Sequence, residues 1–331
     1  MNIKAAWRLI QMKEKGCLVG TSSNPPRSPG EVIVGKWRGN RYIVNRLLGK
    51  GANGTVYLVN RQGRREKYAL KIGYDALDLQ SEINVLTSLQ SCRVRRDQRS
   101  RGASPMSAYF LESDDASEGG FPFYVMRYVQ GAPLHYFLSR KGSSWLGLIG
   151  LQLLDRLCGL HECGFIFGDL KPENVMVSEY GEAELIDFGG AGPIGRSVKQ
   201  FTEWHDRGYW NAGSRIGDEG YDLFAFAVLC LRLLDETGLQ NASRQLPQTR
   251  SGDDLIKLTG QLPDKKLASW LRLALKGGFS TSAEARDMWK SHVYTSRPRK
   301  PEPMATPRWL TGAFALSLCL LAFTVYWIYH F

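Results

Sequence analysis

The stretch from Phe167 to Asn174, Phe-Gly-Asp-Leu-Lys-Pro-Glu-Asn, constrains the fold of this chain more than any other feature. It places an acid, a cation and an amide at fixed spacing on one short loop. Asp169 can accept a proton, Lys171 can hold an anionic group, and Asn174 can ligate a metal ion. Together these are the requirements for transferring a phosphoryl group from ATP to a hydroxyl.

The segments around this loop predict one α+β domain from about residue 35 to about 294. Alternating apolar residues come first and suit an antiparallel sheet, in segments 41–48, 55–59, 67–72 and 123–128. Helical periodicity follows at 146–161, 221–234 and 267–275. Strands before helices predict two lobes, an N-lobe sheet at about 35–129 and a helical C-lobe at about 130–294.

Three glycines, Gly49, Gly51 and Gly54, lie between two strand-like segments and are followed by Val56. Glycines at such a turn let backbone amides approach phosphate oxygens, because no Cβ stands in the way. A dinucleotide-binding loop would continue directly into a helix, whereas residues 55–59 have strand character. The pattern therefore favours a hairpin loop that covers phosphates.

Lys71 is a lone cation in the apolar strand of residues 68–72, where an unpaired charge is costly. The alternative is a surface lysine on an edge strand. A carboxylate partner is available downstream, because Glu82 lies beside Ile83 on a predicted helix face made of Leu79, Ile83, Leu86 and Leu89. We therefore expect an ion pair between Lys71 and Glu82.

Asp187, in Leu-Ile-Asp-Phe-Gly, adds a second metal-binding group to Asn174. In this order and spacing, the glycine loop, Lys71, the Asp169 loop and Asp187 resemble the motifs of protein kinases. Lys171 with the following Pro-Glu resembles the Ser/Thr branch. The chain resembles a bacterial eukaryotic-like (Hanks-type) Ser/Thr protein kinase, similar to the small single-pass kinases of spore-forming bacilli.

The resemblance implies ATP and Mg²⁺ as cofactors and protein hydroxyls as substrates, including hydroxyls of the chain itself. Asp169 would be the base, Lys171 and Lys71 would hold phosphate, and Asn174 and Asp187 would bind the metal. The nucleotide would contact the glycine loop and a further set of residues: Val56, Ala69, Met126 and Tyr128. Asp222 would anchor the catalytic loop, and Glu82 would pair with Lys71 at a spacing shorter than is usual in the family.

The chain departs from the family pattern at several positions. Phe167 replaces a histidine and should still pack against Phe188, whereas Gly168 replaces the arginine that often pairs with a phosphorylated activation loop. We therefore expect that phosphate on Ser197 or Thr202 is not the switch. The end of the activation segment, at residues 212–214, lacks its usual glutamate, and no arginine partner is evident. The alternatives are a catalytically weak pseudokinase acting as a membrane-bound sensor or scaffold, and a small-molecule phosphotransferase.

The C-terminal segment 309–331 contains no Asp, Glu, Lys or Arg. As a helix it would be roughly 34 Å long, enough for a hydrocarbon core of about 30 Å, so we expect a transmembrane tail anchor. The basic, Pro-rich linker at 295–308 predicts that the kinase domain faces the cytoplasm. Residues 1–34 form an N-terminal extension, which is either a membrane-surface helix or a short helix packed on the domain.

The net charge of +11 predicts attraction to polyanions. Its densest basic stretch follows the helix of Glu82, and it is either a solvated loop or a site for DNA or anionic lipid, made by Arg93, Arg95, Arg96, Arg99 and Arg101. Six cysteines are scattered without zinc-like spacing, and we expect them to be reduced thiols.

Overall fold

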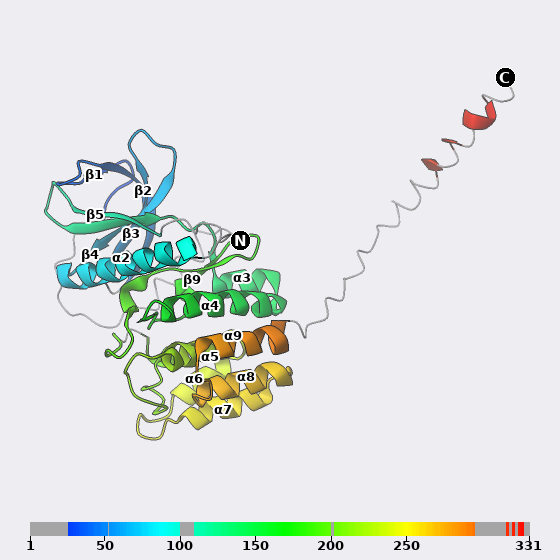
Figure 1. Cartoon of the computed structure of the whole chain (residues 1–331). Helices are drawn as coiled ribbons and strands as arrows, with labels where there is room; N and C mark the ends of the chain where they lie inside the picture. The colour runs from blue at the N-terminus through cyan, green and yellow to red at the C-terminus, as the bar shows by residue number, and fades with distance from the viewer. Residues whose placement is uncertain are drawn as a thin grey trace. The chain divides into compact units, whose positions relative to one another are not determined.

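The computed structural model of the chain describes residues 26–51, 53–99, 109–199 and 202–294, together with 316–317, 320–321 and 324–327. Contacts divide the chain into two units, residues 1–294 and residues 295–331. The first unit has the predicted two lobes, a sheet followed in sequence by a helical layer (Figure 1).

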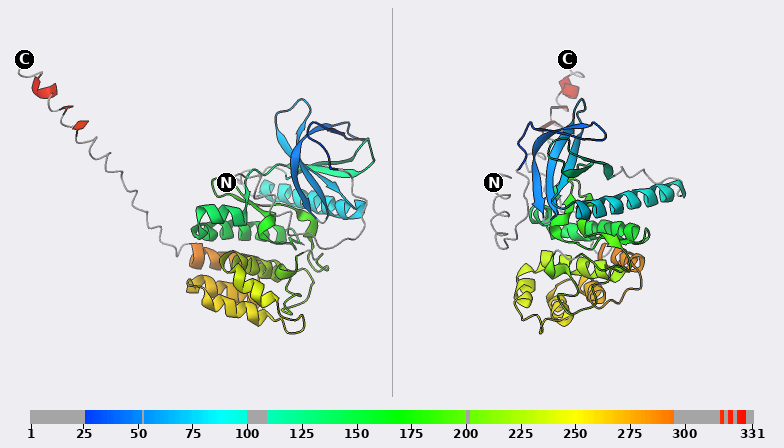
Figure 2. Two further views of the ribbon diagram at one scale, coloured as in Figure 1. Left: turned by 180° about the vertical axis from the view of Figure 1, so that it is seen from behind. Right: turned by 90° about the vertical axis from the view of Figure 1, so that its left-hand side faces the viewer.

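The N-lobe is a six-stranded antiparallel sheet in the order β1-β2-β3-β4-β6-β5, with one long helix, α2, against it (Figure 2). Its elements are β1 Val32–Val34, β2 Arg41–Gly51, β3 Gly54–Arg61, β4 Lys67–Gly73, α2 Ala76–Arg99, β5 Phe110–Asp115 and β6 Pro122–Arg127. The Asp75 side chain accepts hydrogen bonds from the backbone amides of Leu77 and Asp78 and so caps the start of α2. The predicted apolar face of α2 is buried.

The four predicted strands correspond to β2, β3, β4 and β6, so the antiparallel N-lobe sheet is confirmed. Two edge strands, β1 and β5, were not predicted. β1 is only three residues long, and β5 has the sequence Phe-Leu-Glu-Ser-Asp-Asp, whose acidic residues hide the strand pattern.

The C-lobe is mostly helical, and its principal helices are α3 Leu134–Lys141, α4 Leu146–His161, α5 Glu219–Leu234, α6 Glu236–Ser243, α7 Gly252–Gln261, α8 Lys265–Leu275 and α9 Ser282–Trp289. Shorter elements connect them: β7 Ala132–Pro133, β8 Phe165–Ile166, β9 Val175–Val177, β10 Ala183–Leu185, β11 Gly192–Pro193, the 3-10 turns η1 Ser143–Trp145, η2 Pro172–Asn174, η3 Phe188–Gly190 and η4 Glu203–His205, and the π-helix η5 Lys290–Tyr294. Its core includes three aromatic rings, Phe226, Trp270 and Trp289, whose centroids lie 4.9–5.4 Å apart. Because these residues come from α5, α8 and α9, the ring cluster joins the helices that support the catalytic loop.

The basic stretch differs from its prediction, because α2 continues to Arg99 and Arg93 to Arg99 therefore lie on the helix rather than after it. Arg101, the N-terminal segment 1–25, the linker 295–308 and most of segment 309–331 lie outside the described residues. Within the parts of the chain that are described, we find no helix with both the length and the apolar character needed to span a membrane.

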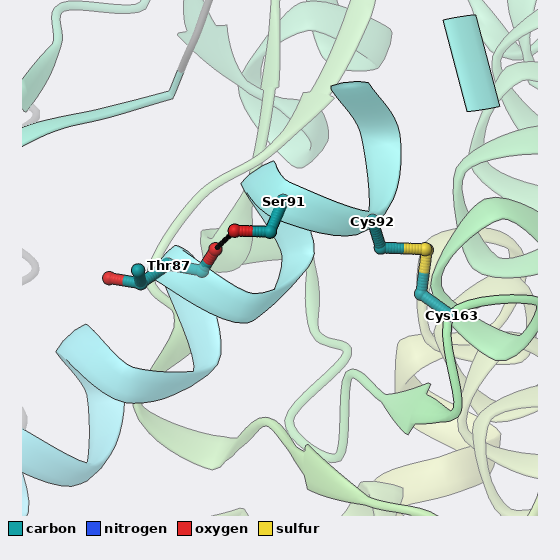
Figure 3. Close-up of a disulfide and its surroundings, with 4 residues drawn as sticks. All are labelled: Thr87, Ser91, Cys92 and Cys163. Carbon is teal, nitrogen blue, oxygen red and sulfur yellow. Dashed lines mark hydrogen bonds between the residues drawn. A yellow bond between two sulfur atoms is a disulfide. The ribbon is translucent and has the colours of Figure 1, made fainter. Parts of the chain in front are cut away.

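The prediction of reduced cysteines is wrong for one pair, because Cys92 and Cys163 form a disulfide (Figure 3). They are 71 positions apart in sequence, but the fold brings their Cα atoms to 6.0 Å. Packing of the lobes creates this proximity, and no sequence spacing reveals it. Cys158 and Cys230 are free and buried.

Candidate active site

The catalytic loop begins at Phe167, directly after β8, and a buried aspartate on α5 anchors it through hydrogen bonds. Asp222 is fully buried, and its carboxylate accepts hydrogen bonds from the backbone amides of Phe167 (2.7 Å) and Gly168 (2.9 Å). The same carboxylate lies 2.9 Å from Nε2 of His161 on α4. The expectation that Asp222 anchors this loop is confirmed.

Asp169 is the centre of a polar cluster. Asn174 donates from Nδ2 to the Asp169 carboxylate (3.0 Å) and to its backbone carbonyl (2.9 Å), and Lys171 Nζ lies 2.8 Å from Oδ2. Thr202, from the activation segment, donates to Oδ1 of Asp169 at 3.0 Å and accepts from Lys171 at 3.0 Å. The structure thus brings together three predicted site residues and adds a fourth, Thr202.

Thr202 was singled out in the sequence only as a phosphate acceptor. Its hydroxyl instead contacts both Asp169 and Lys171, so a substitution there perturbs the catalytic groups whatever its phosphorylation state. Ser197 is different, because it is exposed and pairs with Ile216 in an antiparallel bridge. Substitution of Ser197 therefore tests control by activation-segment phosphate without also disturbing Asp169 or Lys171, whereas substitution of Thr202 does not.

Gly168 has a left-handed backbone with φ +75°. A Cβ at this position would lie 2.4 Å from the Gly190 carbonyl oxygen, a distance that real side chains do not adopt. The catalytic loop packs so closely against η3 that position 168 has no room for the arginine of the family or for any other side chain.

Phe167 packs on Phe188 as predicted. The ring centroids are 5.4 Å apart with an interplanar angle of 86°, an edge-to-face contact. Tyr109 continues the stack, with its ring 5.2 Å from that of Phe188. This column of rings joins the catalytic loop, η3 and the segment before β5.

Lys71 of β4 forms ion pairs with two acids at once. Its Nζ lies 2.8 Å from Glu82 Oε2 on α2 and 2.8 Å from Asp187 Oδ1. The short sequence spacing between Lys71 and Glu82 is therefore compatible with direct contact. Tyr124 of β6 donates a hydrogen bond of 2.8 Å to the other oxygen of Glu82.

Tyr124 was missed in the sequence, although a signal was present. It stands two residues before Met126 on one strand, so both side chains point to the same face, the one predicted to line the nucleotide pocket. Tyr124 is fully buried.

The pKa values in this cluster follow from burial and from the ion pairs. Burial lowers the pKa of Lys71, but Asp187 and Glu82 outweigh it and hold that pKa above its usual range, so the ammonium stays charged. Burial raises the pKa of Glu82 despite Lys71. Burial also acts to raise the pKa of Asp187, yet the charge of Lys71 holds it below its ordinary value, so this carboxylate is ready to bind a cation.

The glycine loop closes the β2–β3 hairpin, where Gly51 pairs with Gly54 and Gly49 pairs with Val56. A Cβ on Gly54 would lie 2.3 Å from the Ile72 carbonyl oxygen, so the loop can approach β4 only with glycine there. Among the described residues, no neighbour lies within 4 Å of a Cβ built on Gly51, which leaves this backbone open to a ligand.

The predicted adenine-pocket residues lie on neighbouring strands. Ala69 of β4 pairs with Met126 of β6, and Val56 of β3 pairs with Lys71. Ala69 and Met126 are buried, Val56 is half-buried, and Tyr128 follows the end of β6. Val56, Ala69, Lys71 and Met126 thus share one region of the sheet.

Contacts from Asn211 and Tyr209 hold the end of the activation segment in place of the glutamate that is usual in the family. Asn211 donates from Nδ2 to the carbonyl oxygens of Pro247 (3.1 Å) and Arg250 (2.8 Å), and the Arg250 guanidinium lies 4.0 Å from the centroid of the Tyr209 ring. Trp210 is fully buried beside them. The lost ion pair at 212–214 is thus replaced by an amide and an arginine that the sequence did not single out.

Two ion pairs hold the chain that follows. Arg215 Nε lies 2.7 Å from the fully buried carboxylate of Asp206, and Arg207 pairs with Asp218 at 2.9 Å. Backbone hydrogen bonds between residues 195–198 and 215–217 add a short antiparallel ladder. Hydrogen bonds and ion pairs therefore hold the described residues of the activation segment in place.

Asn174 and Asp187 have the chemistry that Mg²⁺ prefers, an amide oxygen and a carboxylate. Asn174 uses its amide nitrogen toward Asp169, and among the described residues its amide oxygen has no protein partner. Groups of three or more His, Cys, Asp or Glu side chains suited to a metal are absent from the described part of the chain. A metal here would depend on substrate phosphates for its remaining ligands.

Comparison with known proteins gives consistent matches. The family model described as "Protein kinase domain" matches residues 42–291. The serine/threonine-protein kinase YabT of Bacillus subtilis (strain 168) is 35% identical over 289 residues, covering 85% of this chain and 81% of that protein. The serine/threonine-protein kinase pkn2 of Myxococcus xanthus is 30% identical over 209 residues, 59% of this chain and 24% of that protein.

Two solved structures are similar in fold. Vaccinia related kinase 3 has a TM-score of 0.62 at 16% identity, covering 82% of this chain and 92% of that one. The PK-1 kinase of Cydia pomonella granulovirus has a TM-score of 0.56 at 16% identity, covering 88% of this chain and 99% of that one. At these identities the similarity shows the two-lobed fold.

Proposed function

The chain belongs to the protein kinase family and is a Ser/Thr protein kinase, and from this premise we propose that it phosphorylates proteins, including itself, at the cytoplasmic face of a membrane. The observation that supports the site most directly is the pair of contacts made by Lys71, which reaches Glu82 on α2 and Asp187 at 2.8 Å each. Asp169 stands in a second cluster, with Asn174 and Lys171.

The reaction begins with a serine or threonine hydroxyl next to Asp169, whose carboxylate accepts the hydroxyl proton. Asn174 and Lys171 orient this carboxylate through the contacts described above. Lys171 also neutralises charge on the migrating phosphoryl group. Thr202 holds the other carboxylate oxygen and aligns the base with the activation segment.

MgATP supplies the phosphoryl group and the cationic charge of the metal. Asn174 and Asp187 would hold the metal, and Lys71, kept in place by Glu82, would bind the α- and β-phosphates. The open backbone at Gly51 suits phosphate oxygens, and Val56, Ala69 and Met126 would enclose the adenine ring. Lys71 would then exchange its contact with Asp187 for one with phosphate.

The membrane location is proposed from the uncharged C-terminal segment 309–331 and the basic linker before it. We further propose that the basic stretch from Arg93 to Arg101 binds a polyanion, either DNA or anionic lipid, and that this binding controls α2. Because α2 contains both Glu82 and Arg93 to Arg99, a ligand at its C-terminal end can act on the Lys71 pair.

Control by activation-segment phosphate is not part of the proposal, because hydrogen bonds and ion pairs already hold the described residues of the segment without a phosphate. Ser197→Ala and Ser197→Glu should therefore change activity by less than about tenfold, the size expected for loss of a charge-assisted anchor. Anionic vesicles and linear DNA, each titrated at two salt concentrations, identify the polyanion, since phosphate contacts weaken steeply with salt.

The catalytic assignment is tested with radiolabelled ATP and a generic protein substrate. Asp169→Asn and Lys71→Ala should each lower label incorporation by about a hundredfold or more. Glu179→Gln, at an exposed carboxylate of the C-lobe, is the control and should remain active. Equal background labelling by wild type and all variants would reject the protein kinase assignment and leave the two alternatives, the membrane-bound sensor and the small-molecule phosphotransferase.

A further inference from the structure

The disulfide between Cys92 and Cys163 joins the two segments that contain the catalytic groups (Figure 3). Cys92 lies on α2, ten residues after Glu82, which corresponds to about 15 Å along the helix. Cys163 lies in the turn between α4 and β8, six residues before Asp169. The bond therefore crosses from the N-lobe helix to the start of the catalytic loop.

The described side chains of α2 make two kinds of contact. Leu79, Ile83, Leu86 and Leu89, all buried, form its apolar face, which packs on the sheet. Leu89 is one turn before Cys92, and the residues between them, Gln90 and Ser91, are polar. Among the described residues, α2 contacts the C-lobe at η3, where its buried leucines share a core with Phe188, and also through the disulfide and an exposed ion pair, Asp78 with Lys199 at 2.7 Å.

The C-lobe side of the bond is a firm support. The Cys163 amide donates to the Leu160 carbonyl, the Gly164 amide donates to the His161 carbonyl, and β8 pairs with β11 directly afterwards. A movement of α2 against both this turn and β4 would change the distance from Glu82 to Lys71. With the bond closed, that distance is 2.8 Å.

The bond is also open to reagents. Both cysteines are half-buried, and their neighbours Ser91, Glu162 and Gly164 are exposed. The free cysteines of the described part of the chain differ, since Cys158 and Cys230 are buried. A thiol reagent in solution would therefore reach the disulfide before it reaches either of these two thiols.

We propose that Cys92 and Cys163 are a reversible oxidation site, reduced by dithiols, whose closed form holds α2 with Glu82 against Lys71. In the reducing direction, one thiolate of the dithiol attacks a sulfur of the bond and forms a mixed disulfide, and the other cysteine leaves as a thiolate that takes up a proton. The second thiol of the reductant then displaces the remaining cysteine. Two electrons pass to the kinase, which gains two thiols, and the reductant becomes a disulfide.

The disulfide would affect phosphoryl transfer indirectly, by fixing the position of Glu82 relative to Lys71. Opening the bond lets α2 occupy arrangements in which Glu82 is away from Lys71, so a smaller fraction of molecules is competent for catalysis. The proposal rests on the proposed kinase activity. It goes beyond that activity because it assigns control of the rate to the disulfide between Cys92 and Cys163.

The experiment uses the full chain, purified without reductant, in three states: oxidised with diamide, reduced with dithiothreitol, and reduced then reoxidised. Initial rates are measured against ATP concentration at a temperature where all three states are folded by circular dichroism. The oxidised protein should have a kcat about three- to tenfold higher than the reduced protein, and reoxidation should restore it. Cys92→Ser and Cys163→Ser should each show the lower kcat in every state.

Cys158→Ser is the matched control, a change at a cysteine outside the bond that should keep the full redox response. Differential alkylation followed by mass spectrometry must find Cys92 linked to Cys163 in the oxidised state. If it finds no such link, or if oxidised and reduced wild type share one kcat, the proposal is overturned. Asp169→Asn gives the background rate: activity above that background without a redox response rejects only this proposal, whereas no activity above it rejects the catalytic assignment.

Discussion

Gly168 shows how one missing side chain can be a requirement of packing. Its φ is +75°, and a Cβ there would lie 2.4 Å from the Gly190 carbonyl oxygen. We expect Gly168→Ala to displace the loop that contains Asp169 and to lower kcat by about tenfold or more, with destabilisation of about 1–3 kcal/mol. The measurements are steady-state kinetics and urea unfolding.

Gly164→Ala separates the backbone effect from the steric one. Gly164 has a similar φ of +79°, but nothing lies within 4 Å of its added Cβ. This variant should lose stability and keep kcat. A Gly168→Ala enzyme as active as Gly164→Ala would show that the contact with Gly190 is unimportant.

Tyr124 is the second residue whose importance depends on one contact. Burial, followed by the charge of Glu82, raises the pKa of Tyr124 far above its ordinary range, so its hydroxyl stays protonated and donates to Glu82. In the proposed nucleotide complex Lys71 exchanges Asp187 for phosphate, and Tyr124 would keep its contact with Glu82. We expect Tyr124→Phe to lower kcat about three- to tenfold, the effect of one hydrogen bond to a charged group.

Tyr42→Phe is the matched control, because Tyr42 is also buried in this sheet and donates to a glutamate, Glu112, but it belongs to a different core cluster from Tyr124. It should reduce stability without changing kcat. Combining Tyr124→Phe with Glu82→Gln tests the route of the effect, since the two losses should not add if Tyr124 acts through Glu82.

Among the elements, the long helices were predicted well and the activation segment poorly. The apolar spacing of residues 79–89 identified α2, because a helix packed on a sheet requires one buried face. The segment 191–218 has no such periodicity. Its order comes from Asn211, Arg215 and a short ladder, each of which contacts residues distant in sequence or depends on backbone pairing.

His205 of η4, in the activation segment, should make the free energy of unfolding depend on pH. Burial, and then the nearby Arg232 guanidinium, lower the pKa of His205 to about 3, and among the described residues neither ring nitrogen has a hydrogen-bond partner. The unfolded chain has a histidine pKa near ~6.5, so it binds a proton first as pH falls. Stability from this group is present above about pH 6.5 and is lost toward pH 3, at about 1.4 kcal/mol per unit.

His205→Leu should therefore flatten the acid side of a plot of unfolding free energy against pH, as measured by urea unfolding between pH 7 and pH 4. His292→Leu, at an exposed histidine, is the comparison and should leave the slope as in wild type. Equal slopes in all three proteins would contradict the assignment.

For the whole molecule, the kinase unit ends at Tyr294, and the proposed membrane anchor follows it. Removal of residues 309–331 should move the protein from the membrane fraction to the soluble fraction while kcat on a soluble substrate stays within about twofold, because no catalytic group lies there. Fractionation with immunoblotting provides the measurement. A truncated protein that stays with membranes would place the attachment elsewhere, for example in the basic residues.

The sequence by itself determined the family, the two-lobed class and the chemical groups of the site, because each motif is short and its chemistry depends on neighbours along the chain. Asp169, Lys171 and Asn174 stand on one loop, and their spacing already implies their proximity. Residues this close along the chain stay close in space, so the pattern can be read without knowledge of the tertiary structure.

Only the tertiary structure decided which distant groups meet. Thr202 reaches Asp169, Tyr124 reaches Glu82, and Cys92 reaches Cys163 across separations of 33, 42 and 71 residues. These contacts arise where α2 packs on the sheet, where the lobes meet and where the activation segment reaches the catalytic loop, and packing depends on the shapes of whole elements rather than on periodicity. The first two complete the site, and the third gives it a covalent link that the scattered cysteines of the sequence did not suggest.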